Sequence, residues 1–506
     1  MNTADHILKK YQEAISVKDH WREKFEEAYE YCLPNRESFY EESPGQKRTD
    51  KIFDETAVVG VQEFASRLQA GIVPTFARWA DFQAGVEIPE EQKPEINKQL
   101  DAITDYVFEV LQNSNFNQEI HESFMDLAVG TGCLLVEDGD AVNPIKFTAV
   151  PLPKLCLMNG PDGRIDTVYR KRTVKPEHIS VLYPRAIIPD TFDPLRMKKD
   201  CSIIEVVYRI YEDNVEKFKY CVVMEEAKAI IFEETYTGEG ANPYLVFRWN
   251  KASGEVYGRG PVFNAMGAIK TCNLTIELIL QNAQMSVSGV YTYEDDGVIN
   301  PDNISLVPGS LIPVAPGSKG LLPIQAASNF DVAQLVLNDM RTNIKKALYM
   351  EALGRPEGTP MTATEVSERM ADLSRQIGSS FGRLQSELIN PLLRRIIRIL
   401  SKQGRIEIPK VNGREVKIAP RSPLAQAQHL QDVADVTRFN EIIAGTFGPQ
   451  MINLIVDQNE TAKYLAEKMN LPEKLIRDEN EQKQLADRMT QLQQSAPEGG
   501  EVPPGT

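Results

Sequence analysis

The segment most informative about the fold is residues 258–288, GRGPVFNAMGAIKTCNLTIELILQNAQMSVS. Glycine and proline at 258, 260 and 261 interrupt the preceding pattern, and the residues after them predict one continuous helix over 260–287. At 1.5 Å per residue this helix would be about 42 Å long, whereas an average globular helix has roughly 11 residues. The sequence therefore predicts an unusually long helix near the middle of the chain.

A second long helix comes after an insertion. Residues 330–350 resume a helical pattern. Residues 289–329, which separate the two predicted helices, are rich in Gly and Pro and carry two short apolar runs, Val290 to Tyr293 and Ser310 to Val314. The pattern predicts an antiparallel hairpin of two long helices, with a compact β-like insertion as a small cap on its end.

Residues 1–250 are predicted to form an α+β body with its helices first. An apolar stripe from Ile7 to Cys32, interrupted only by Lys18, predicts a long amphipathic helix that Pro34 ends. We interpret this stripe as the face that packs onto the helix's own domain. Further helices are expected at 56–72, 94–112 and 117–130. From Gly132 to about Asn250, β-branched and aromatic residues predict antiparallel strands, among them Ile203 to Tyr211, Lys217 to Met224 and Tyr244 to Trp249.

The chain after the hairpin is predicted to be mainly helical. A loop over 351–361 carries Gly354, Pro356, Gly358 and Pro360. Thr362 and Glu365 then form a capping box that starts a helix reaching about Leu388, which Asn390-Pro391 restarts or kinks before Leu392 to Lys402. Residues 424–480 are helical again, and the Gln-rich, then Pro/Gly-rich end from 482 to 506 is expected to be flexible.

Composition limits the possible functions. The 506 residues are 42% hydrophobic and 25% charged, which is typical of a globular protein of about three domains. The net charge of −16 argues against a surface that grips nucleic acid, but is compatible with a protein that DNA passes without sticking. The six cysteines have no metal-ligand spacing and are expected to be reduced and buried, as in proteins made in a cytoplasm.

The sequence also gives no sign of secretion or of a membrane span. The first residues, MNTADHILKKYQEA, lack the apolar core of a signal peptide. No uninterrupted apolar run reaches the roughly 18 residues that cross a bilayer. We therefore expect a soluble chain that works where it is made, or in something assembled there, with no membrane partner.

Motifs for catalysis are weak. Gly378-Ser379-Ser380-Phe381-Gly382 matches a nucleophile elbow but lies inside a helical pattern, where small residues that let helices pack closely are the better interpretation. Glycines 254, 258 and 260 fit no phosphate-binding motif, and the five histidines form no metal-binding pair. Acidic residues at 294–303 miss the spacing of a calcium loop and are interpreted as a solvated turn. We predict no catalytic residues, no metal and no cofactor, and hence no enzyme.

A basic helix near residue 400 allows two interpretations. Its cations interleave with isoleucines and leucine, so it could meet nucleic acid or an anionic surface. It could equally be an amphipathic helix whose long side chains lie beside acidic neighbours. Its basic residues are Arg394, Arg395, Arg398, Lys402 and Arg405.

The order of these parts resembles a known family. A long helix pair with a small insertion, a Gly/Pro loop and then a long kinked helix is the order in viral portal proteins, and the chain is similar to the head-to-tail connectors of short-tailed, T7-like bacteriophages (podoviruses). Four segments carry the resemblance: TAVVGVQEFASRLQAGIVPTFARWADFQAG (56–85), NFNQEIHESFMDLAVGTGCLLVED (115–138), residues 248–289 with Tyr257-Gly-Arg-Gly260, and MTATEVSERMADLSRQIGSSFGRLQSELINPLLRRIIRIL (361–400).

The resemblance implies a helix-rich α+β portal fold that assembles as a ring of twelve copies at one capsid vertex. Its parts would be a wing (1–258 and 364–422), stem helices (259–288 and 330–350), a clip (289–329), a channel loop (351–363), a crown (423–482) and a flexible tail (483–506). Double-stranded DNA would be packaged and ejected through the ring. The implied partners are the terminase large subunit, a tail adaptor, and the major capsid and scaffolding proteins. The implied location is the virion, after assembly in the host cytoplasm.

Within this scheme, a few cations are expected to steady DNA along a largely repulsive wall. The first candidate is Arg355 in the loop, followed by Lys345 and Lys346 just before it, and then by Arg259 and Lys270 on the first stem helix. The loop itself carries Glu351, Gly354, Pro356, Gly358 and Pro360, whose glycines allow movement and whose prolines oppose helix formation.

Two other classes of protein remain as alternatives. One is an α+β enzyme made in a cytoplasm, with a site built from the turn at 254–260 and scattered carboxylates. The other is a different structural virion protein such as a tail adaptor, although adaptors are usually shorter and lack the order of hairpin and loop.

Overall fold

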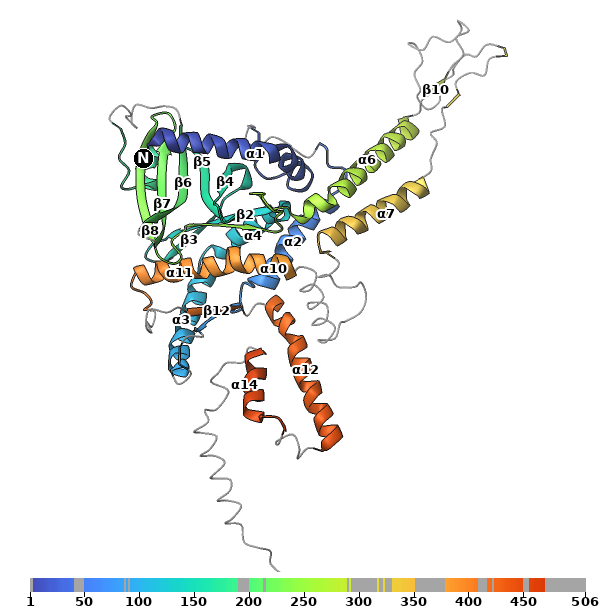
Figure 1. Cartoon of the computed structure of the whole chain (residues 1–506). Helices are drawn as coiled ribbons and strands as arrows, with labels where there is room; N and C mark the ends of the chain where they lie inside the picture. The colour runs from blue at the N-terminus through green and yellow to red at the C-terminus, as the bar shows by residue number, and fades with distance from the viewer. Residues whose placement is uncertain are drawn as a thin grey trace, which may run out of the picture. The chain divides into compact units, whose positions relative to one another are not determined.

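The structure is a computed structural model of the whole chain (Figure 1). It describes residues 3–40, 50–85, 88–89, 92–189, 200–212, 215–288, 291–292, 316–317, 322–323, 330–350, 378–407, 416–420, 423–448 and 455–468. The chain divides into two compact units, one of residues 1–360 and 377–419 and the other of residues 361–376 and 420–506.

The centre of the first unit is an antiparallel sheet of five strands in the order β4-β5-β6-β7-β8. Strand pairs such as Tyr169 with Val206, and Val206 with Cys221, set its register. Because side chains alternate across a strand, these residues share one face, and Glu205 points to the other. The strands are β4 (Leu155–Asn159), β5 (Ile165–Val174), β6 (Cys201–Glu212), β7 (Val215–Met224) and β8 (Ala229–Thr237).

Helix α1 (Ala4–Cys32) covers the first face of this sheet. Its residues Ile7, Tyr11 and Ala14 are buried in one cluster with Tyr169, Val206 and the rest of that face. The predicted apolar stripe is therefore core-facing, as interpreted. The polar interruption is part of the same packing, because Lys18 is buried and its ammonium donates to the carbonyl of Pro153 and lies over the ring of Phe39.

The opposite face meets a second antiparallel sheet in the order β3-β2-β9 through a buried polar network. Glu205 is 1% exposed and accepts hydrogen bonds from Arg172 (2.9 Å), Tyr183 and Tyr244 (both 2.5 Å). Burial raises the pKa of Glu205, but Arg170 and Arg172 outweigh it and lower the value overall. Since Tyr244 belongs to the second sheet, this carboxylate joins the two. The strands of the second sheet are β2 (Thr131–Asp138), β3 (Ile145–Ala149) and β9 (Tyr244–Arg248).

Helices α2 (Thr56–Ile72), α3 (Lys93–Asn113) and α4 (Phe116–Val129) complete the body. The α4 helix leads directly into β2, and α2 packs against α4. The bounds agree with the helices predicted at 56–72, 94–112 and 117–130. Smaller elements are β1 (Ala80–Ala84), which pairs with β12 (Val416–Pro420), the turn η1 (Leu152–Lys154), and helix α5 (Pro176–Leu182) within the predicted strand region.

The predicted helix hairpin is present. Helix α6 (Pro261–Ser288) runs beside helix α7 (Phe330–Ala347) in the opposite direction (Figure 1). Within the insertion between them, the short strands β10 (Tyr291–Thr292) and β11 (Leu322–Pro323) pair antiparallel. The second helix ends three residues before the predicted 350, because Tyr349 has a positive φ of 58°.

The long kinked helix is also present, with a different kind of irregularity from the one predicted. Helix α10 (Gly378–Leu384) continues through a π-helical turn, η3 (Gln385–Ile389), into α11 (Asn390–Lys402). Pro391 directly follows the π-helical turn, and because proline has no N–H, it cannot make the backbone hydrogen bond to the preceding turn. The capping box at 362–365 and the helix before residue 378 lie outside the described residues.

The second unit contains helices α12 (Pro423–Phe447) and α14 (Gln458–Lys468), which pack together. Ile443 and Ala466 are buried between them, and Lys468 forms an ion pair with Asp432 at 3.3 Å. This agrees with the helical pattern predicted from 424, while residues 469–506 lie outside the described part.

Candidate functional site

The candidate site is the α6–α7 hairpin and the body that holds its base. Helix α6 begins where three backbone segments touch. A Cβ on Gly260 would lie 2.0 Å from the carbonyl oxygen of Ala128, and one on Gly258 would lie 2.2 Å from that of Gly130. The Gly258 N–H donates to Thr131 Oγ1 at 2.8 Å. These glycines therefore bring the start of α6 against the turn between α4 and β2, which is a structural use and not that of a phosphate-binding loop.

Tyr257 ties the same junction to α1. Its side chain is fully buried, its hydroxyl accepts the N–H of Leu157 at 3.2 Å, and its ring lies 5.6 Å from that of Phe25. Next to it, Arg259 pairs with Glu255 at 2.5 Å and lies over the ring of Trp21 at 5.1 Å. The Tyr-Gly-Arg-Gly sequence is thus the anchor of the hairpin's first helix.

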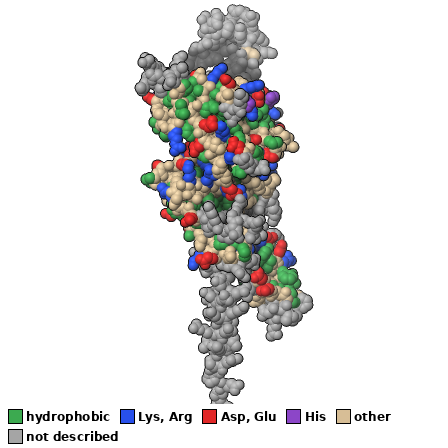
Figure 2. Space-filling model, turned by 60° about the vertical axis from the view of Figure 1, so that its left-hand side comes forward, with side chains coloured by type: hydrophobic (Ala, Val, Ile, Leu, Met, Phe, Trp, Pro, Cys, Tyr) green, Lys and Arg blue, Asp and Glu red, His purple; other side chains and the backbone are tan. Residues whose placement is uncertain are grey.

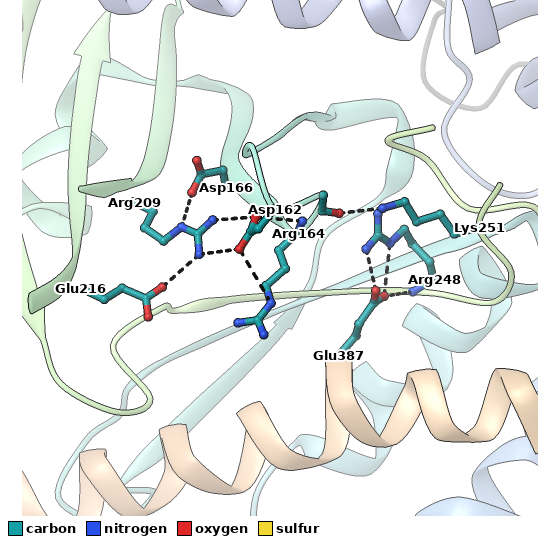
Figure 3. A network of polar contacts seen from close by, with 9 residues as sticks. Asp162, Arg164, Asp166, Arg209, Glu216, Arg248, Lys251 and Glu387 are labelled. Atoms are coloured by element: carbon teal, nitrogen blue, oxygen red, sulfur yellow. Dashed lines mark hydrogen bonds and ion pairs between the residues drawn. The ribbon is translucent and has the colours of Figure 1, made fainter. Parts of the chain in front are cut away.

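An ion pair fastens the kinked helix to the same region (Figure 3). Glu387, on the π-helical turn, accepts from the backbone N–H of Arg248 at 2.9 Å and from its guanidinium at 2.6 and 3.2 Å. The Arg248 side chain is only 4% exposed. The extra residue of a π-turn shifts side chains around the helix axis. The turn η3 therefore directs the Glu387 side chain toward β9.

The turn between β4 and β5 is held from two sides in the same view (Figure 3). The Arg209 guanidinium donates to Asp166 at 2.5 Å and to Asp162 at 3.0 Å, and contacts Glu216 at 3.4 Å. On the other side, Lys251 donates to the carbonyl of Gly163 at 2.6 Å. Burial, and then the charge of Arg248, lower the pKa of Lys251. The turn thereby links the tip of the five-stranded sheet to the segment that enters α6.

A second polar cluster holds both helices of the hairpin to α2. Asn273 of α6 is buried, and its Oδ1 accepts from the N–H groups of Phe53 (2.7 Å) and Asp54 (3.0 Å). Asp54 in turn accepts from Thr56 N at 2.8 Å and from Arg341 of α7 at 2.8 Å. Burial raises the pKa of Asp54, but the hydrogen bonds from Thr56 and Arg341 bring it below its ordinary value.

The end of α7 is also held along α2. Leu348 is fully buried, and its Cδ1 would lie 2.5 Å from a Cβ on Gly60. The Arg67 guanidinium donates to the carbonyl of Met350. Tyr349, at its positive φ, contacts the rings of Trp249 at 5.7 Å and Phe64 at 6.5 Å.

The part of the hairpin beyond these contacts exposes apolar side chains. The first half of α6 is buried at Val262, Ala265, Ile269 and Cys272. Farther along, Leu274 and Leu278 are 57% and 56% exposed, and Leu335 on α7 is 64% exposed. Leu280 and Val336 are exposed as well. Leu274 and Leu278 are four residues apart and so lie on one face of α6.

The predicted cation sites have different surroundings. Lys345 and Lys346 are exposed in the last turn of α7. Lys270 forms an ion pair with Glu27 of α1, and Arg259 has the partners given above. Arg355 and the other predicted loop residues, Glu351, Gly354, Pro356, Gly358 and Pro360, lie outside the described residues.

The basic helix near residue 400 contacts the body. Arg395 is buried and donates to the carbonyls of Val136 (3.1 Å), Gly240 and Ala241 (both 3.2 Å). Arg398 donates to the carbonyl of Thr237, and Lys402 pairs with Asp138 at 3.3 Å. These contacts favour the interpretation as a packed amphipathic helix over a nucleic-acid surface.

The residues that resembled catalytic or metal-binding motifs have structural roles, as far as they belong to the described part of the chain. Ser380 of the elbow-like motif lies within α10 and donates to Asn250 Oδ1 at 3.0 Å. Among the described residues, a Cβ on Gly378 or Gly382 would meet nothing within 4 Å, whereas Ser380 is buried, so close packing at this motif involves the serine and not the two glycines. All six cysteines are free and buried, as predicted. No group of metal-binding side chains occurs among the described residues, and the acidic segment 294–303 lies outside them.

Surface charge on the described part is mixed. Figure 2 shows Lys and Arg side chains interspersed with Asp and Glu over the face turned to the viewer. None of the helices in the described ranges has the length and apolar character to span a bilayer. Sequence reasoning missed Asn273, Asp54, Arg341 and Glu387, because single polar residues in helices give no signal of a partner far away in the chain.

Comparison with known proteins identifies the class. A family described as "Bacteriophage head to tail connecting protein" matches residues 4–476. A probable portal protein of Bordetella phage BPP-1 is 23% identical over 97% of this chain and 92% of its own. Portal proteins of Salmonella phage epsilon15 (22% identity, 76% of this chain, 72% of the relative) and Escherichia phage T7 (25%, 42% and 40%) are also similar. A chain of a gene transfer agent virion covers 82% of this chain and is itself 93% covered, at 12% identity and a TM-score of 0.39.

The long helix hairpin anchored on an α+β body is therefore that of a phage structural protein. The chain belongs to the bacteriophage head-to-tail connecting protein family. As a member of that family, it is a virion component that connects head and tail.

Proposed function

We propose that twelve copies of this chain form a closed ring, and that double-stranded DNA enters and leaves the head through its bore. The observation that carries this proposal is the exposed apolar face of the hairpin. Leucine side chains more than half exposed on two neighbouring helices cost free energy in water unless another surface covers them. In a closed ring every copy offers the same pair of flanks, so each hairpin covers the next.

The charge of the chain fits a conduit. DNA binds proteins through cations that replace its counterions, and each contact adds salt-dependent affinity. A net charge of −16 per chain gives a wall with little such affinity. Lys345 and Lys346, exposed at the end of α7, and Arg355 after it would steady the duplex. Arg259 and Lys270 are weaker candidates, because each already has a carboxylate partner.

The domain assignment is built around the hairpin. Residues 1–258 and 364–422 would be the wing, 259–288 and 330–350 the stem, and 289–329 the clip. Residues 351–363 would be the channel loop, 423–482 the crown and 483–506 a flexible tail. A second compact unit takes up the chain from residue 420, close to the proposed start of the crown at 423, and this supports a distinct crown; the same unit also includes residues 361–376. The clip would meet the terminase large subunit during packaging and the tail adaptor afterwards, with capsid and scaffolding proteins around the wing.

This role needs no covalent chemistry from the chain, and we infer that it has none of its own. We also infer assembly in the host cytoplasm, where the buried free thiols of all six cysteines stay reduced. The alternative enzyme site at residues 254–260 lacks support, since Gly258 and Gly260 are occupied by backbone contacts with residues 128–130.

The test is the mass of the purified protein and the effect of one surface change. Twelve chains of 56.8 kDa give a ring of about 0.7 MDa. Light scattering should find this mass, and negative-stain images should show an annulus with a central hole. Leu278→Glu should abolish the ring and leave a folded smaller species, because it places a charge on the proposed contact.

Val181→Glu is the matched control, because Val181 is 75% exposed on α5, away from the hairpin. That variant should form the ring like the wild type. A wild-type protein that stays a small oligomer over a range of salt concentrations, or a Leu278→Glu variant that assembles normally, would contradict the proposed ring.

A further inference from the structure

The end of α7 conflicts with its own sequence. Residues 344–350, Ile-Lys-Lys-Ala-Leu-Tyr-Met, contain no glycine, proline or other strong helix breaker, so local propensity favours a helix that continues. The helix nevertheless ends at Ala347, and Tyr349 takes a φ of 58°. A bulky residue in this left-handed region is unfavourable, and it persists only where surrounding contacts hold it.

Three sets of contacts, with α2 and with Trp249 just after β9, hold this conformation in place. The Tyr349 ring lies against Phe64 and Trp249, and Trp249 is 1% exposed. Leu348 fills the space that the missing side chain of Gly60 leaves. Arg67 binds the carbonyl of Met350. The remaining backbone bonds at this turn are a helical one from Leu348 N to Ile344 O (3.0 Å) and a tighter one from Tyr349 N to Lys346 O (3.1 Å).

We propose that Tyr349 is a conformational switch at the end of α7. When its ring is docked against Phe64 and Trp249, it ends the helix. When it is released, the turn at residues 348 and 349 takes helical angles, and α7 joins Met350, which is already helical, without a break. Both states are built from short-range changes. Release exchanges the tight bond from Tyr349 N to Lys346 O for a helical one and allows a second helical bond from Met350 N, while both ring contacts of Tyr349 and the Arg67 bond are lost.

The switch stands on this geometry alone, and only its consequence rests on the proposed function. In a DNA-carrying ring, the end of α7 sets the direction in which the chain leaves Lys345 and Lys346. The docked and released states would therefore present these cations and the segment after them differently to the bore.

Two substitutions of Tyr349 separate the effect of backbone preference from the effect of losing the aromatic side chain. Tyr349→Gly and Tyr349→Ala both remove the aromatic contacts, but glycine accepts a positive φ and alanine does not. Hydrogen exchange of the assembled protein, corrected for intrinsic rates, measures protection of the amides at 349 and 350. We expect protection in Tyr349→Ala to exceed that in Tyr349→Gly by about tenfold, because the left-handed conformation costs an alanine about that factor.

Arg67→Ala gives a second test with the tyrosine intact. Removing a bond to Met350 would lower protection there if Arg67 only stabilised the turn, whereas release of the switch should raise it. Arg67→Lys, which keeps a donor, should resemble the wild type. Equal protection in the two Tyr349 variants, or lower protection in Arg67→Ala, overturns the switch. These results do not depend on DNA, so loss of packaging with an intact switch would count against the proposed function instead.

Discussion

At the scale of single residues, Lys18 is a cation buried within the packed body. Lys18 is 6% exposed, its ammonium donates to a single backbone carbonyl, and burial lowers its pKa to about 8. A lysine in an unfolded chain has a pKa of about 10.4. The folded state therefore binds the proton less tightly than the unfolded state does.

The pH dependence of stability comes from this difference. Below pH 8 Lys18 is charged in both states and the full cost of burying the charge is present. As pH rises from 8 to about 10.4 the folded protein releases the proton first, so stability from this group increases, by up to about 3 kcal/mol. Lys18→Met lacks this contribution. Urea unfolding of both proteins should show that the free energy of unfolding of the wild type, relative to that of the variant, is larger at pH 10 than at pH 7. The same difference at both pH values would contradict the buried charge.

A second prediction concerns a residue without a side chain. Gly260→Ala would place a methyl carbon 2.0 Å from the carbonyl oxygen of Ala128, and the groups in contact are backbone that cannot rotate away. We expect a loss of about 3 kcal/mol in the free energy of unfolding, measured by chemical denaturation. Gly382→Ala is the control, because its Cβ meets nothing within 4 Å in the exposed interior of a helix. That variant should gain about 0.5 to 1 kcal/mol.

At the scale of elements, the kinked helix is held by a carboxylate that its π-turn presents. Glu387→Gln leaves the buried Arg248 guanidinium without a counter-charge, which costs about 3 kcal/mol in comparable sites. Glu216→Gln is the matched control, because it changes an exposed partner of Arg209 at 3.4 Å. Its effect should stay below about 1 kcal/mol. Denaturation midpoints compare the two, and equal effects would show that the π-turn does not depend on its ion pair.

The elements themselves were largely predictable. The bounds of α2, α3, α4 and α6 come from apolar periodicity and from Pro and Gly, and these are local properties of the chain. The end of α7 was not predictable, because its sequence favours helix and only contacts with Gly60, Phe64 and Trp249 end it. The basic helix also remained ambiguous until Arg395 was placed against three carbonyls of the body.

At the scale of the whole molecule, the proposed DNA contacts make a prediction about particles. Arg355→Glu, or Lys345→Glu with Lys346→Glu, should leave ring assembly intact and lower the amount of DNA packaged or retained, because each substitution replaces a phosphate contact with repulsion. The measurement is DNA content per assembled particle. Lys9→Glu, a change on the exposed side of α1, is the control and should have no effect. Normal DNA content with Arg355→Glu would contradict the loop as a DNA contact and leave the family assignment unchanged.

The order of parts could be predicted from the amino-acid sequence: helices before strands, a long hairpin with an insertion, and a kinked helix after a Gly/Pro stretch. Periodicity and turn residues encode these through neighbours only a few positions apart. Three other features become visible only in the folded chain: which charges are already paired, why Gly258 and Gly260 are glycines, and that Tyr349 is strained. Each of these depends on a residue many positions away in the chain, and a single sequence carries no record of such distances.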